Sequence, residues 1–71
     1  MSTEIKAPMA GKISSITASL GDQVKEDDEI IVMVAMKMEI PVDAPCAGTI
    51  KEINVKIGDS VNEGQVLAIL D

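Results

Sequence analysis

The chain repeats itself at an offset of 37 residues. Ala7–Ile13 aligns with Ala44–Ile50, and Leu20–Glu26 aligns with Ile57–Glu63, with no gap between the two blocks. Two copies are too few for a solenoid, which needs about three or more. We therefore expect two quasi-equivalent halves related by a pseudo-two-fold axis, at about 4–34 and 41–71, within a single domain over 1–71. The identical pairs are Ala7/Ala44, Pro8/Pro45, Ala10/Ala47, Gly11/Gly48, Ile13/Ile50, Ile16/Ile53, Gly21/Gly58, Asp22/Asp59, Val24/Val61 and Glu26/Glu63.

The apolar residues favour strands. Ten Ile and seven Val outnumber three Leu, and β-branched side chains are restricted in helices and pack well on sheets. Pro and Gly interrupt the chain so often that no segment can carry a typical helix. We predict an all-β fold in which the two halves form a flattened barrel or sandwich of two interlocked four-stranded antiparallel sheets.

The expected strands can be placed coarsely within each half. Turns are expected at Gly21-Asp22 and Gly58-Asp59, because Gly adopts positive φ and Asp bonds to nearby backbone. The strands are expected at Glu4–Ala7, at Gly11 through Ile16, at Val24, at Glu29–Ala35, at Met38–Asp43 or Ile40–Ala44, at Gly48 through Ile50, Ile53, Val55 and Ile57, at Val61, and at Val66–Leu70.

Several classes of function are excluded by missing residue types. Without His, the chain cannot build a Ser-His or Cys-His nucleophile, and one Cys cannot complete a zinc site. The lack of aromatic residues and the net charge of −6 argue against nucleic-acid binding. The longest apolar run, Ile30–Met36, is far shorter than the ~20 residues that span a bilayer. A lone Cys46 suits a reducing compartment, so we expect a non-enzymatic, cytoplasmic module.

The turn between the halves breaks the usual rules for hairpins. Glu29–Ala35 must reverse into the next strand through a short turn centred on Met36-Lys37. Tight hairpin turns prefer Asn or Gly, since their central residues need positive φ. This turn instead places apolar, flexible Met residues at an exposed tip. A departure of this kind predicts a functional site at Met36-Lys37-Met38.

The segment Ala35-Met36-Lys37-Met38-Glu39, set between two such halves, resembles the attachment site of biotin carboxyl carrier proteins. The resemblance extends from about Glu4 to Asp71 and implies the biotinyl-lipoyl barrel-sandwich hybrid fold. It implies that a separate biotin protein ligase joins biotin to Lys37 through an amide. It further implies that Ala35, Met36, Met38 and Glu39 are recognised by the ligase or by partner enzymes.

The resemblance also implies the partners of the chain. The carried group would shuttle a carboxyl group between a biotin carboxylase and a carboxyltransferase or decarboxylase, of acyl-CoA, pyruvate or oxaloacetate type. Many family members have Glu where this chain has Val34. The chain runs directly from Gly11 to Gly21 without room for a protruding thumb, as in the thumbless carriers.

Other interpretations remain open for several residues. The site could carry lipoyl, although lipoyl sites usually read Asp-Lys-Ala, or the chain could be an unmodified adaptor domain of the same fold. Met36 or Met38 could instead fill the core. The acidic run Asp27-Asp28-Glu29 lacks the spaced ligands of a calcium loop and is expected to be solvated. Cys46 replaces Met9 of the other half and is expected to be a small buried apolar residue.

Overall fold

The computed structural model describes residues 2–71, and every regular element in that range is a strand. The all-β prediction is therefore confirmed. The two-residue strands at Val24 and Val61 and the long strands at 29–35 and 66–70 are also as expected. The strands are β1 (Thr3–Lys6), β2 (Gly11–Ile16), β3 (Gln23–Val24), β4 (Glu29–Ala35), β5 (Met38–Asp43), β6 (Gly48–Ile53), β7 (Ser60–Val61) and β8 (Val66–Leu70).

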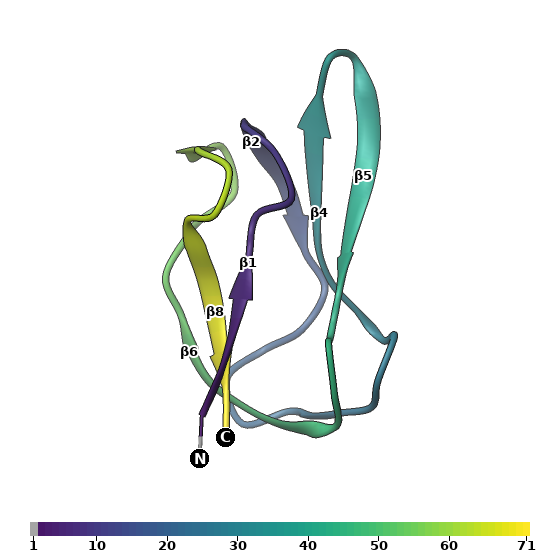
Figure 1. Ribbon diagram of the computed structural model, residues 1–71, viewed down its shortest axis with the longest axis vertical. Coiled ribbons are helices and arrows are strands. Elements are labelled where there is room, and N and C mark those ends of the chain that lie inside the picture. The colour runs from purple at the N-terminus through teal and green to yellow at the C-terminus, as the bar shows by residue number, and fades with distance from the viewer. Residues whose placement is uncertain (1) are drawn as a thin grey trace.

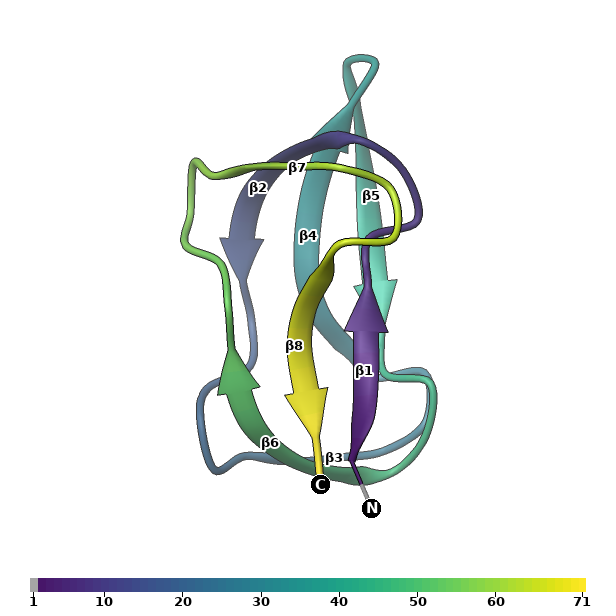
Figure 2. The same cartoon turned by 60° about the vertical axis from the view of Figure 1, so that its left-hand side comes forward.

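The strands form two four-stranded antiparallel sheets that exchange strands between the halves (Figure 2). One sheet has the order β1-β8-β6-β3, and the other has the order β5-β4-β2-β7. Each sheet thus takes two strands from each half, and the two orders match under the offset of 37 residues. Neither half can complete a sheet alone, which explains why the repeat builds one shared core. The predicted barrel-sandwich of two interlocked sheets is confirmed.

Backbone hydrogen bonds between the halves follow the same symmetry. The Gly21 N–H donates to the Ile50 carbonyl at 2.9 Å, and the Gly58 N–H donates to the Ile13 carbonyl at 2.8 Å. The Ala7 N–H donates to the Gln65 carbonyl at 2.9 Å, as Ala44 does to Asp28 at 2.8 Å. The loops of one half therefore satisfy backbone groups of the other, which leaves few groups unpaired where the strands end.

Side chains stabilise the four loops in equivalent ways. The carboxylates of Asp22 and Asp59 each accept a hydrogen bond at 2.9 Å from the backbone N–H three residues earlier. Asp28 does the same at 2.9 Å, and Gln65 uses its amide oxygen at 3.0 Å. The acidic loop is thus built for turn formation, because Asp side chains mimic a backbone turn. No cluster of three potential metal ligands occurs within the described residues.

The core lies between the two sheets and contains only apolar side chains among residues 2–71. Ile and Val together make up nine of its 17 buried hydrophobic residues, in line with the β-branched composition, and Met33 is fully buried within it. Cys46 is only partly buried and packs against this core, with its Sγ 3.7 Å from the Thr3 hydroxyl, so the expectation of a buried Cys46 is met in part. The seven most deeply buried large side chains are Ile13, Ile30, Ile31, Met33, Ile50, Leu67 and Leu70.

Two expected strands end earlier than the apolar pattern suggests. β6 stops at Ile53, so Val55 lies outside it although it is buried, and Ile57 is 67% exposed in the turn before Gly58. The Asn54 N–H makes one further hydrogen bond to the Leu67 carbonyl of β8. The backbone of Lys56 then bonds to Asp59 within the following turn, so the chain leaves the sheet between these residues. β1 ends at Lys6, because the next N–H, that of Ala7, bonds to the Gln65 carbonyl in the loop before β8.

The molecule is elongated, with principal extents of 32 × 17 × 17 Å. The turn that joins β4 to β5 projects at one end, and both termini lie at the other (Figure 1). In the described range no helix is long and apolar enough to cross a membrane. The fold therefore presents one segment, residues 35–38, far from the ends of the chain.

Candidate functional site

The projecting turn is a two-residue hairpin loop with unusual backbone geometry. Ala35 pairs with Met38 across the end of the β4–β5 ladder. Met36 and Lys37 form the loop, with φ of 52° and 64°. Positive φ at both central positions matches the twist of the flanking strands. For residues with a Cβ this conformation costs roughly 1–2 kcal/mol each, so the β4–β5 pairing holds two strained residues at the tip.

The side chains of this turn point outward. Met36 is 88% exposed and Met38 is 57% exposed, so neither fills the core as the alternative interpretation required. Lys37 is exposed as well. Because these Met side chains are exposed, they add little hydrophobic stabilisation to the fold. They instead form a flexible apolar surface on either side of Lys37.

The base of the turn is packed into the fold, whereas its tip is exposed. Ala35 is buried, with only 4% of its surface exposed, and Val34 pairs with exposed Glu39 on β5. Ala35 therefore anchors the turn, while Glu39 lies on an edge strand of its sheet. Of the predicted recognition residues, Met36, Met38 and Glu39 are accessible to a partner and Ala35 is not.

The amine of Lys37 is available for chemistry. Among residues 2–71 the one ion pair joins Lys6 Nζ to Glu4 at 3.8 Å, within β1, and does not involve Lys37. A primary amine of this kind can attack an activated acyl group and form an amide. The chain supplies no His that could act as a general base for such a reaction.

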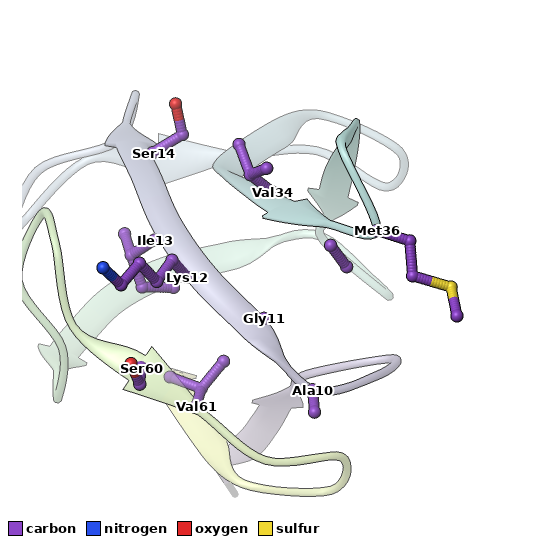
Figure 3. A pocket seen from close by; sticks show the side chains of 10 residues that line it. Ala10, Gly11, Lys12, Ile13, Ser14, Val34, Met36, Ser60 and Val61 are labelled. Atoms are coloured by element: carbon purple, nitrogen blue, oxygen red, sulfur yellow. The ribbon is translucent and has the colours of Figure 1, made fainter.

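An open groove of about 640 Å³ lies beside the turn, a feature that the sequence did not reveal (Figure 3). Its walls come from β2, from the end of β4 and from β7. The lining residues are Ala10, Gly11, Lys12, Ile13, Ser14, Val34, Ala35, Met36, Ser60 and Val61. The sequence alone does not predict this groove, because nothing local indicates that residues 10–14 adjoin residues 60–61.

A smaller groove of about 450 Å³ occupies the symmetry-related position. Ala47, Gly48 and Thr49 replace Ala10, Gly11 and Lys12 under the offset of 37 residues. Nothing in its lining corresponds to Ala35 or Met36. The turn therefore distinguishes the two ends of an otherwise repetitive fold.

A protein-family model matches almost the whole chain, and individual relatives match about half of it. The family model described as "Biotin-requiring enzyme" matches residues 3–70. The chain is 50% identical over 36 residues to the 1.3S subunit of methylmalonyl-CoA carboxyltransferase from Propionibacterium freudenreichii subsp. shermanii, covering 51% of this chain and 29% of that subunit. It is 52% identical over 33 residues to the mitochondrial methylcrotonoyl-CoA carboxylase subunit alpha of Mus musculus, covering 46% of this chain and 5% of that protein.

A solved structure shares the fold over the full length of the chain. The urea carboxylase of Kluyveromyces lactis aligns with a TM-score of 0.96 and 30% identity, covering 100% of this chain and 6% of that protein. The chain thus spans only a small part of each of these relatives.

Proposed function

The chain belongs to the family of biotin-requiring enzymes, and on that basis we propose that it is a biotin carboxyl carrier in which Lys37 holds biotin through an amide. The observation that carries the proposal is the position of Lys37. It is exposed at the tip of a strained two-residue turn at one end of an elongated fold. The carrier unit is proposed to be a single biotinyl domain over 1–71, with halves at about 4–34 and 41–71; position 1 lies outside the described residues.

The residues at the turn fit a covalent acyl group. The Lys37 side chain is exposed and carries a nucleophilic amine, and the residues beside it present no carboxylate contact. An amide bond would form between Nζ and the carboxyl carbon of biotin, with loss of a carboxylate oxygen and of the positive charge. The modified chain would be one unit more negative than its formal −6. A separate biotin protein ligase would activate the biotin carboxylate with ATP.

The fold would serve mainly to present the carried group. When bound, biotin supplies a ring nitrogen that accepts and releases a carboxyl group. The β4–β5 hairpin holds Lys37 at the end of the fold that lies away from both termini, where partner active sites could receive its side chain (Figure 1). Tethering raises the effective concentration of the group at each partner site.

The proposed partners follow from this role and from the relatives. They are a biotin carboxylase and a carboxyltransferase or decarboxylase, in line with the carboxyltransferase subunit and the carboxylase that resemble this chain. The domain itself would be non-catalytic, which suits a chain without His. A cytoplasmic location is part of the proposal and is supported by the free thiol of Cys46.

Met36, Met38 and Glu39 are proposed to be the residues that the ligase and the partners contact, with Ala35 positioning them. The two Met side chains flank Lys37 and are 88% and 57% exposed. Fewer than about 30% of interface residues contribute more than 1 kcal/mol to binding, and these cluster near the centre of the contact, where Met36 would lie beside Lys37. Ala35 would act indirectly, because it is buried beneath the turn.

The attachment is tested by intact-mass and peptide mass spectrometry after incubation with a biotin ligase, biotin and ATP. We expect one biotinyl increment on the wild type and on Lys51→Arg, which alters another exposed Lys. Lys37→Arg should show none, since it keeps the charge but not the reactive amine. An increment on another Lys, a lipoyl increment in cells that contain both ligases, or no increment would refute the proposal.

The recognition role is tested separately by the rate of ligation. Met36→Ala should lower that rate about ten-fold, the effect of losing about 1.4 kcal/mol of binding. Met9→Ala is the matched control, because Met9 is also exposed but does not flank Lys37. Equal rates for the two variants would show that Met36 has no part in recognition.

A further inference from the structure

We propose that the groove beside the hairpin is a resting site for the biotin ring carried by Lys37, an inference that rests on the proposed function. The groove holds about 640 Å³, within the ~300–1,000 Å³ typical of sites that bind small organic molecules. It adjoins the attachment turn directly, because Ala35 and Met36 belong to both. The ring would lie against β2, between the end of β4 and β7.

The outward-facing residues that line the groove are short, with the exception of Lys12. Along β2 and the bend before it, side chains alternate between the two faces of the sheet, so exposed Ala10, Lys12 and Ser14 face out while Ile13 faces the core. Exposed Ser60, paired with Lys12, adds another short side chain. Half-buried Val34 borders the hollow (Figure 3).

The attachment residue is within reach of the groove. The Cα atoms of Met36 and Lys37 are neighbours, about 3.8 Å apart, and the methylene chain of Lys together with the acyl chain of biotin extends several times farther. The Met36 side chain points away from the groove and leaves it open (Figure 3). An attached ring is therefore present at a high effective concentration beside an accessible apolar surface.

The chemistry of the lining suits a bicyclic ureido ring. Exposed Ala10 and half-buried Gly11 and Val34 offer apolar atoms to its hydrocarbon and sulfur-containing part. The hydroxyls of Ser14 and Ser60 and the ammonium of Lys12 lie among the same lining residues and can donate to a ureido carbonyl. Such a mixture of apolar walls and a few polar groups is typical of small-molecule sites.

The symmetry-related groove provides a control within the same molecule. It contains Ala47 where the first has Ala10, but it lies at the end of the fold that holds β3 and the termini (Figure 2). The turn that carries Lys37 lies at the other end (Figure 1). The arm should therefore occupy one groove and not the other.

The test compares the unmodified and biotinylated full chains by NMR, after mass spectrometry has shown biotin on Lys37. We expect amide shift changes at Gly11, Ser14 and Ser60, and nuclear Overhauser contacts from the ring protons to the methyl groups of Ala10 or Val34. Gly48 and Thr49 in the second groove should not change. Changes confined to residues 35–39, without ring contacts, would overturn the inference.

A pair of matched variants adds a kinetic measurement. Ala10→Phe fills the proposed site and Ala47→Phe fills its symmetry mate, and both residues are exposed. If the ring spends half its time in the groove, Ala10→Phe should speed capture by streptavidin about two-fold over the wild type, while Ala47→Phe should not. Equal capture rates in all three proteins would contradict the resting site. Failure of biotin to attach at all would overturn the proposed function together with this inference.

Discussion

Substituting Gly11 by Ala should destabilise the fold much more than the same substitution at Gly48, although the two residues are equivalent in the repeat. A Cβ at Gly11 would lie 2.5 Å from the Val34 carbonyl oxygen and 2.8 Å from Met33 Cε. A Cβ at Gly48 would lie 3.2 Å from the Asp71 carbonyl oxygen. The Met33 side chain can rotate away, but the Val34 carbonyl belongs to a strand that is paired on both sides, by β2 and by β5. The clash at Gly11 therefore requires a backbone shift.

The expected size of the difference follows from these clearances. Overpacking costs about 1–3 kcal/mol, and replacing Gly by Ala restores about 0.4–1 kcal/mol through the unfolded chain. Because the 2.5 Å clash is with backbone, the upper part of the overpacking range applies, about 2–3 kcal/mol. Gly11→Ala should thus lose about 1–2.6 kcal/mol, or about 4–21 °C in Tm for a domain of this size. At Gly48 a shift of a few tenths of an ångström relieves the contact, so its Tm should change by less than about 4 °C.

Thermal and urea unfolding followed by far-UV circular dichroism measure both variants, since the chain has no aromatic residue to serve as a fluorescent probe. The predicted order of Tm is Gly48→Ala close to wild type and Gly11→Ala clearly below both. Equal losses of stability in the two variants, or a larger loss for Gly48→Ala, would refute the argument that β4 cannot shift where it approaches the β4–β5 turn.

Three further predictions concern the core and the loops and can be measured by the same unfolding assays. Met33→Ala should cost about 2–5 kcal/mol, because Met33 is fully buried, whereas Met36→Ala should stay within about 0.5 kcal/mol; similar losses would contradict the burial assigned to them. Gly64→Ala should cost about 1 kcal/mol because φ is 82° there, and a neutral effect would argue against this geometry. Asp59→Ala should cost about 1 kcal/mol, because the Lys56 N–H loses the carboxylate that accepts its hydrogen bond. An unchanged Tm would show that this hydrogen bond does not stabilise the fold.

The repeat made most of the fold predictable. Because both copies place Gly-Asp turns and short strands at the same positions, the number of strands and the two sheets follow from the alignment of the sequence with itself. The exposed turn was predictable for a different reason. Met36 and Lys37 violate hairpin preferences, and the structure places both at positive φ.

Other features depend on contacts that the sequence does not display. The apolar pattern wrongly extended β6 to Val55 and Ile57, because Val55 is buried without belonging to the strand and the turn before Gly58 already begins at exposed Ile57. The groove depends on Ser14 and Ser60 lying near each other, and these residues come from different halves. Periodicity within one strand carries no information about such neighbours.

The most direct test of the carrier role is the transfer of labelled carboxyl groups. Biotinylated protein, incubated with a biotin carboxylase, ATP and ¹⁴C-bicarbonate, should acquire label in proportion to its biotin content, and Lys37→Arg treated identically should acquire none. The label should leave the protein when a carboxyltransferase and its acceptor are added. If the biotinylated protein gains no label under conditions in which the same carboxylase accepts free biotin, this chain does not act as a carboxyl carrier.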